Sequence, residues 1–233
     1  MITYNDAIEL SYLYGNNKLK DCIQFIYDKL ECTDIIDFFH KLKKEKFTNT
    51  NQAIKLAYKT KELVVFEENF LTNIPEPKIL TETVKEYTLT VSAPRIINGE
   101  LLSNHCIHSL HYNNETLNLT TEEDYNLLPL QLAKGCEGKI KEIYSMFDNM
   151  YLFYLSKDYC SRFFLNQESI ITAINYTFID EPENMIKEQL FLMEKFNFNY
   201  RDFDYISFNK ARKLLTTGVK ILNDRHSSKT QTI

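Results

Sequence analysis

Apolar residues recur at every third or fourth position through much of the first seventy residues, which is the spacing of one face of a helix. This spacing predicts helices over residues 3–14, 18–30, 33–42 and 49–63. Thr3 or Asn5 is the expected cap of the first helix, and Thr33 is the expected cap of the third. Residues 1–72 are therefore expected to form a helical unit of short antiparallel elements.

Alternating patterns replace the helical spacing in the middle of the chain. Pro75 and Pro77 cannot continue a helix, because proline lacks a backbone N–H and restricts the residue before it, so residues 73–82 are expected to be a linker. Tyr87–Val91 alternates and is rich in β-forming residues. The Asn98-Gly99 pair is the strongest hairpin signal in the chain. A small antiparallel sheet is predicted over residues 84–119.

Turn and capping signals mark where this sheet ends and helices resume. Asn113-Asn114 is a second candidate turn. Thr120 and Glu123 have the spacing of a capping box, in which a hydroxyl and a carboxylate satisfy backbone amides reciprocally. A helix is therefore expected to begin there. Pro129 interrupts it, and helical spacing returns over residues 139–149.

The C-terminal third contains two ambiguous segments and two clear helix starts. Residues 150–156 and 161–179 each fit either a strand or a buried helix. Glu181-Pro182-Glu183 is a favourable helix start, because proline suits the first position and acidic groups favour the positive end of the helix dipole. Ser207 or Asn209 is the expected cap of the last helix.

These patterns predict an α+β fold that is predominantly α-helical, with a small antiparallel sheet in the middle and C-terminal helices. Only 5 Gly and 5 Pro occur in the chain, which favours helices over a many-stranded sandwich or barrel. The expected organisation is a helical unit over 1–72, a linker over 73–82, a sheet with helices over 83–223 and a flexible tail over 224–233.

Charge and cysteine content narrow the classes of partner and the compartment. The net charge is −5, whereas nucleic-acid binders usually show a basic excess, so no nucleic-acid partner is expected. Five cysteines without regular spacing suit free thiols in a reducing compartment. The N-terminus lacks the features of a signal peptide, and no apolar run is long enough to span a bilayer. We therefore expect a cytoplasmic protein without a membrane partner, in the host cytoplasm if it is viral.

One histidine cluster invites a metal hypothesis. His105, Cys106, His108 and His111 lie within seven residues, and imidazole and thiolate are zinc ligands. On a strand, however, His105 and His111 would share one face, while Cys106 and His108 would share the other. A further ligand would have to come from elsewhere in the chain. We expect no cofactor and no metal site, with His105, His108 and His111 as the candidates if a metal does bind.

Aromatic residues are dense near the C-terminus. Most are expected to be core, but the surplus suits an interface, because aromatic rings anchor protein contacts in desolvated pockets. The candidates for contact with a partner are Phe196, Phe198, Tyr200, Phe203 and Tyr205. No dinucleotide fingerprint, nucleophile elbow or HExxH motif is present, so the chain is not expected to be an enzyme.

The stretch from Leu190 to Leu222 (LFLMEKFNFNYRDFDYISFNKARKLLTTGVKIL) resembles the end of baseplate-hub and tail-assembly proteins of contractile-tailed bacteriophages. Those proteins often close with a helix, a short aromatic break, a second small helix and a final helix. The sheet followed by helices over residues 84–149 is similar to that group in outline. The resemblance covers about a third of the chain. It implies a non-enzymatic factor for assembly of the baseplate hub, with other tail proteins as partners.

Two other functions fit the sequence. The chain could be an inhibitor or immunity-type protein that binds a host or rival factor, which a gene neighbourhood without tail genes would favour. It could also be a small metal-dependent enzyme that uses the His105–His111 region, with zinc as the candidate metal. An assembly protein that binds other viral proteins is the first hypothesis.

Overall fold

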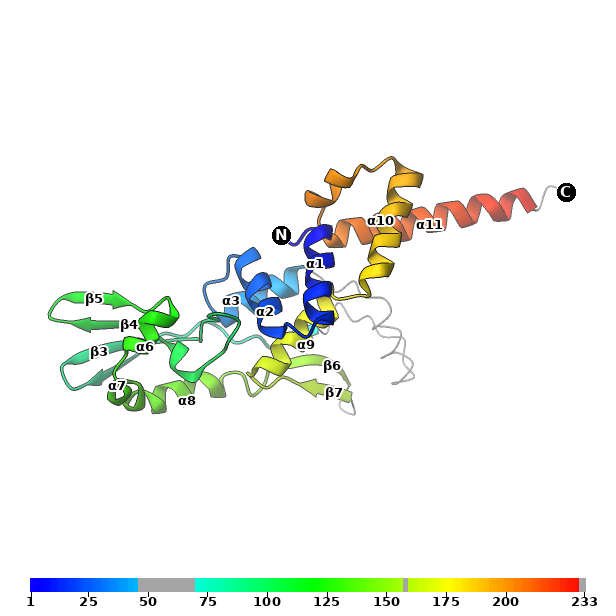
Figure 1. Cartoon of the computed structure of the whole chain (residues 1–233). Coiled ribbons are helices and arrows are strands. Elements are labelled where there is room, and N and C mark those ends of the chain that lie inside the picture. The colour runs from blue at the N-terminus through cyan, green and yellow to red at the C-terminus, as the bar shows by residue number, and fades with distance from the viewer. Residues whose placement is uncertain (46–69, 157–158, 231–233) are drawn as a thin grey trace.

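The computed structural model describes residues 1–45, 70–156 and 159–230. The fold is α+β and mostly helical, as predicted, but it holds two small antiparallel sheets instead of one. The molecule is elongated (Figure 1): a four-stranded sheet lies at one end, the N-terminal helices and the second sheet lie in the middle, and the last two long helices lie at the other end. The helix predicted over residues 49–63 lies outside the described residues.

Three short helices begin the chain, close to where the sequence predicts them. They are α1 (Tyr4–Gly15), α2 (Leu19–Lys29) and α3 (Ile35–Lys44). Thr3 caps α1 in a capping box with Asp6, which confirms one of its two expected caps. Asp34, and not Thr33, caps α3. The Asp34 carboxylate accepts hydrogen bonds from the amides of Ile36 at 2.8 Å and Asp37 at 2.9 Å. These two bonds favour Asp34 over Thr33 as the cap.

The four-stranded sheet is an antiparallel meander at one end of the molecule. Its strands are β2 (Leu80–Val84), β3 (Tyr87–Val91), β4 (Ile107–Tyr112) and β5 (Glu115–Asn118). A short 3₁₀ helix, η1 (Ser103–Cys106), precedes β4. The Asn113-Asn114 turn is confirmed, and both residues adopt positive φ (46° and 65°). β2 begins at Leu80, so the last three residues of the predicted linker belong to a strand, because Leu80 pairs with Val91 and shares its buried face.

The Asn98-Gly99 pair forms the expected turn, but no strands flank it. Only an isolated bridge joins Ile97 to Glu100. The turn packs on α2 instead: the Gly99 amide donates to the Gln24 side chain at 2.7 Å. This close approach to a helix, and not a hairpin, accounts for the glycine.

Three short helices follow the sheet. They are α6 (Glu122–Leu127), α7 (Leu130–Gly135) and α8 (Glu137–Ser145). The capping box of α6 is formed by Thr121 and Asp124, one residue later than the predicted Thr120 and Glu123. The shift arises because the shorter Asp124 carboxylate accepts from the amides of both Thr120 and Thr121, each at 2.8 Å. Pro129 separates α6 from α7, as predicted.

A second sheet joins distant parts of the chain. Its strands, in the order β1-β6-β7, are β1 (Phe70–Thr72), β6 (Tyr151–Ser156) and β7 (Tyr159–Arg162). The ambiguous segment 150–156 is therefore a strand, and Phe153 in it pairs with Phe70 across the sheet. The Phe153 ring also meets Tyr176 of α9 (Gln167–Phe178) edge to face, with centroids 4.5 Å apart.

The C-terminal helices meet the N-terminal ones. They are α10 (Pro182–Phe196), the 3₁₀ helix η2 (Tyr200–Asp204) and α11 (Phe208–Thr230). Pro182 opens α10, as predicted. Of the two expected caps of α11, Ser207 accepts from the Lys210 amide at 3.3 Å. The helix runs to Thr230, so the predicted tail at 224–233 begins inside it.

One continuous core connects the two ends of the chain. Tyr4 of α1 is buried against two C-terminal rings, Phe203 and Phe208, with centroids 5.6 Å from each. The buried residues of the N-terminal helices, the sheets and α9–α11 form a single cluster. Within the described residues, no helix is both long and apolar enough to cross a membrane.

Candidate protein-binding surface

The histidine cluster does not converge on a common point. His105 and Cys106 belong to η1 and not to a strand, so the expected sharing of strand faces is wrong for both. His105 is buried, with Nδ1 3.1 Å from the Arg95 carbonyl oxygen and its ring packed on Tyr125 at 4.8 Å between centroids. Burial lowers the pKa of His105. This imidazole has the surroundings of a core histidine.

The other two histidines have separate partners. His108 Nε2 lies 2.7 Å from the Ala93 carbonyl oxygen, and burial lowers the pKa of His108. His111 lies between two hydroxyls, with Nε2 3.0 Å from Ser109 Oγ and Nδ1 2.8 Å from Thr116 Oγ1. No group of three His, Cys, Asp or Glu side chains in the described part of the chain could hold a metal ion. The metal-dependent alternative therefore gains no support from this region.

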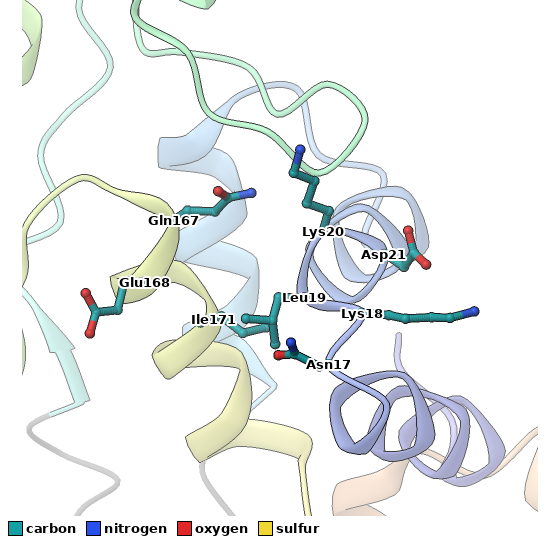
Figure 2. Close-up of a pocket in the computed structure, with 8 residues that line it drawn as sticks. All are labelled: Asn17, Lys18, Leu19, Lys20, Asp21, Gln167, Glu168 and Ile171. Carbon is teal, nitrogen blue, oxygen red and sulfur yellow. The ribbon is translucent and has the colours of Figure 1, made fainter.

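A cleft between the starts of α2 and α9 does not gather reactive groups either. Its volume is about 620 Å³. Figure 2 shows Leu19 and Ile171 meeting at its centre, while Lys18 and Asp21 point to one side and Glu168 to the other. An active site usually brings a few polar groups together over an apolar lining. The charged groups here diverge, so the cleft offers no constellation for catalysis.

A second hollow lies on the arm formed by η1 and α6–α8, where it is about 710 Å³ in volume. Leu128, Ile140 and Tyr144 are among its lining residues. Leu130 also lines the hollow and is 68% exposed, and Leu127, three residues earlier in the chain, is 80% exposed. The leucines on either side of Pro129 break the helical spacing, which is the one signal in the sequence that points to an outward apolar surface here.

Two of the five aromatic candidates pack inside the protein. Phe203 is fully buried, so it cannot contact a partner, which corrects its place among the candidates. Its ring packs at a tilt against the rings of Tyr4 and Phe198, with centroids 5.6 Å and 5.7 Å away. Phe198 is half-buried on the same core. Aromatic density alone does not show which rings turn inward.

The other three candidates face solvent and are called the aromatic surface below: Phe196, Tyr200 and Tyr205. They are 41%, 63% and 78% exposed, respectively. Phe196 ends α10, whereas Tyr200 and Tyr205 lie in the segment that joins α10 to α11, the orange stretch in Figure 1. It lies against α1, where the backbone of Thr3 bridges to Ser207.

Hydrogen bonds hold this segment in one conformation. The Asn199 side chain accepts from the Arg201 amide at 2.9 Å, and the Asp202 carboxylate accepts from the Asn199 amide at 2.7 Å. Asn5 of α1 donates to Asp204 at 2.6 Å. With Phe203 anchored in the core, Tyr200 and Tyr205 are presented on a fixed platform.

A polar network joins α1, α10 and α11. Arg212 of α11 pairs with Asp180 at 2.9 Å and with Glu188 of α10 at 2.9 Å. The Tyr4 hydroxyl donates to Glu188. Burial raises the pKa of Glu188. Three segments distant in sequence are thus fastened at one largely buried cation.

Comparisons of this chain with protein-family models, with curated proteins and with solved structures find no match. The likeness of Leu190–Leu222 to the end of tail-assembly proteins therefore stays an expectation from the sequence.

Proposed function

We propose that this protein acts without catalysis, by binding other proteins, and that it serves the assembly of the baseplate hub or tail of a contractile-tailed bacteriophage. The observation that carries the first part is the aromatic surface, in which Tyr200 and Tyr205 project from a fixed platform. The resemblance of Leu190–Leu222 to tail-assembly proteins supports the second part.

Exposed tyrosines on a fixed backbone are suited to protein binding. A tyrosine ring offers a large contact area with few rotatable bonds, so little side-chain entropy is lost when a partner covers it. Tyrosine is enriched among the few interface residues whose truncation to alanine costs about 2 kcal/mol or more in binding free energy. The capping bonds of η2 mean that the backbone need not be ordered on binding.

Co-purification with and without the aromatic surface tests this function. The tagged full chain and its Tyr200→Ser/Tyr205→Ser variant would be isolated from cells in which the phage tail proteins are produced. The wild type is expected to bring down tail or baseplate proteins, and the double variant is expected to lose most of them. Quantitative mass spectrometry measures the recovery.

The control removes two exposed tyrosines elsewhere, in Tyr12→Ser/Tyr154→Ser, and should keep the partners. A wild-type protein that recovers no protein partner would overturn the proposed function. A host or rival protein bound through Tyr200 and Tyr205, with no tail protein present, would overturn the role in tail assembly and support an inhibitor or immunity protein.

A further inference from the structure

Helix α11 carries a row of lysines beside exposed apolar residues. Lys210, Lys213 and Lys220 are exposed, and Leu214 and Ile221 are 40% and 44% exposed. Residues three, four and seven apart lie on one side of a helix, so these five side chains form a continuous strip. We call them the lysine strip. It covers about three helical turns, or roughly 16 Å.

The lysine strip is a basic region in an acidic protein. The net charge of the chain is −5, yet no Asp or Glu occurs from Tyr205 to Asn223. Arg212 is neutralised by Asp180 and Glu188. Among the side chains that the structure describes, no ion pair involves the three lysines of the strip. Their charge is available to a partner.

The apolar part of the strip continues onto α10. A Cβ at Gly218 would lie 2.2 Å from the ring of Phe196, so this ring rests directly on α11. Gly218 lies four residues after Leu214 and three before Ile221, which makes Phe196 their neighbour. The lysine strip and the aromatic surface therefore adjoin at this ring.

We propose that the lysine strip is a docking site for an acidic amphipathic helix of a partner protein. This inference rests on the proposed function and specifies the chemistry of the partner. Leu214 and Ile221 are seven residues apart, the spacing at which a heptad repeat presents its apolar positions. Glutamate or aspartate beside those positions on the partner would face the lysines.

Charge distinguishes this partner from a second copy of the chain. Two lysine strips packed together would place six lysines in one interface, and Asp224, four residues after Lys220, offsets only one of the three in each copy. α11 already has its helical conformation and extends from the body of the molecule (Figure 1), so an incoming helix has access to it. The partner contributes the negative charge and the matching apolar positions.

A designed peptide pair tests the chemistry on the full chain. The acidic peptide has 21 residues (about three heptads), leucine at the a and d positions and glutamate at e and g, which keeps it from pairing with itself. The second peptide has lysine in place of every glutamate. Fluorescence anisotropy is expected to show the acidic peptide binding about tenfold tighter than the lysine peptide, with weaker binding at high salt.

Two variants show whether the strip is the site. Lys210→Glu/Lys213→Glu/Lys220→Glu should weaken binding of the acidic peptide about tenfold or more. Leu214→Ser/Ile221→Ser should also weaken it. The matched control, Lys18→Glu/Lys134→Glu/Lys141→Glu, makes the same change in net charge elsewhere and should leave binding unchanged. Equal binding of both peptides, or an unaffected triple variant of the strip, would overturn the proposal.

Other occupants are separate outcomes. The wild type could bind vesicles of anionic phospholipid but not the acidic peptide, with vesicle binding lost in the strip variant. That result would assign the strip to a membrane surface and overturn the proposal. Sedimentation that shows a dimer dissociated by the strip variant would assign it to a second copy. If the wild type brings down partners but the strip variant recovers them equally, this inference fails while the proposed function stands.

Discussion

Gly99 occupies a place in which a side chain has no room. Its φ is +69°, and a Cβ there would lie 2.1 Å from the Lys20 carbonyl oxygen. Gly138, in the first turn of α8, has no atom within 4 Å of its Cβ position. The same substitution at these two glycines should therefore have opposite effects on stability.

We expect Gly99→Ala to lower the free energy of unfolding by about 2 kcal/mol or more, from the positive φ and the contact with the α2 backbone. Gly138→Ala should raise it by about 0.5–1 kcal/mol, because alanine favours a helix and loses less entropy on folding. Urea denaturation followed by circular dichroism measures both. Wild-type stability in Gly99→Ala would mean that the turn does not pack on α2.

At the scale of single elements, α6 depends on one carboxylate. Asp124 accepts from the amides of Thr120 and Thr121, and these bonds lower its pKa from 3.8 to about 2. Because the pKa in the folded protein lies below the ordinary value, the cap stabilises α6 fully above about pH 3.8 and is lost as the pH falls through about 2.

This cap can be tested by titration. An NMR titration of the Asp124 carboxyl group should give a pKa of about 2 in the wild type. The Thr121 hydroxyl accepts from the Asp124 amide and also helps to lower the pKa of the Asp124 carboxyl group, so Thr121→Ala should move this pKa toward its ordinary value. Thr81→Ala, at an exposed position in β2, should leave it unchanged. An Asp124 pKa near 3.8 in the wild type would contradict the observed capping geometry.

At the scale of the whole molecule, one cation joins the two ends of the chain. Arg212 contacts Asp180 and Glu188, and Tyr4 of α1 bonds to the same Glu188. The side chains of Arg212, Asp180 and Glu188 are only 13%, 11% and 21% exposed, respectively. Removal of the cation would leave two carboxylates unpaired in a poorly hydrated site.

We expect Arg212→Met to lower the free energy of unfolding by about 3 kcal/mol. The loss should be smaller in acidic buffer, because Glu188, whose pKa burial already raises, would then be protonated without its partner. Lys29→Met breaks the more exposed Lys29–Asp6 pair and should change stability by about 1 kcal/mol or less. Thermal and urea denaturation measure both variants. Equal losses of stability in the two variants would show that burial of the Arg212 ion pairs does not increase the cost of breaking them.

The sequence by itself determined the features that depend on neighbouring residues. Thr3 as a cap, Asn113-Asn114 as a turn and Pro182 as a helix start all follow from hydrogen bonds or steric limits within a few residues. Where two adjacent residues could cap a helix, as with Thr33 and Asp34, the better hydrogen-bond acceptor forms the cap. Such choices shift a boundary by one residue and leave the element in place.

Only the tertiary structure decided which segments far apart along the chain contact each other. The pairing of Phe70 with Phe153 made residues 150–156 a strand, although their pattern suits a helix equally. The core around Tyr4 buried Phe203 and left Tyr200 exposed, although both belong to one aromatic run. The reason is physical: local preferences act over a few residues, whereas burial depends on contacts between segments that the chain brings together only when it folds.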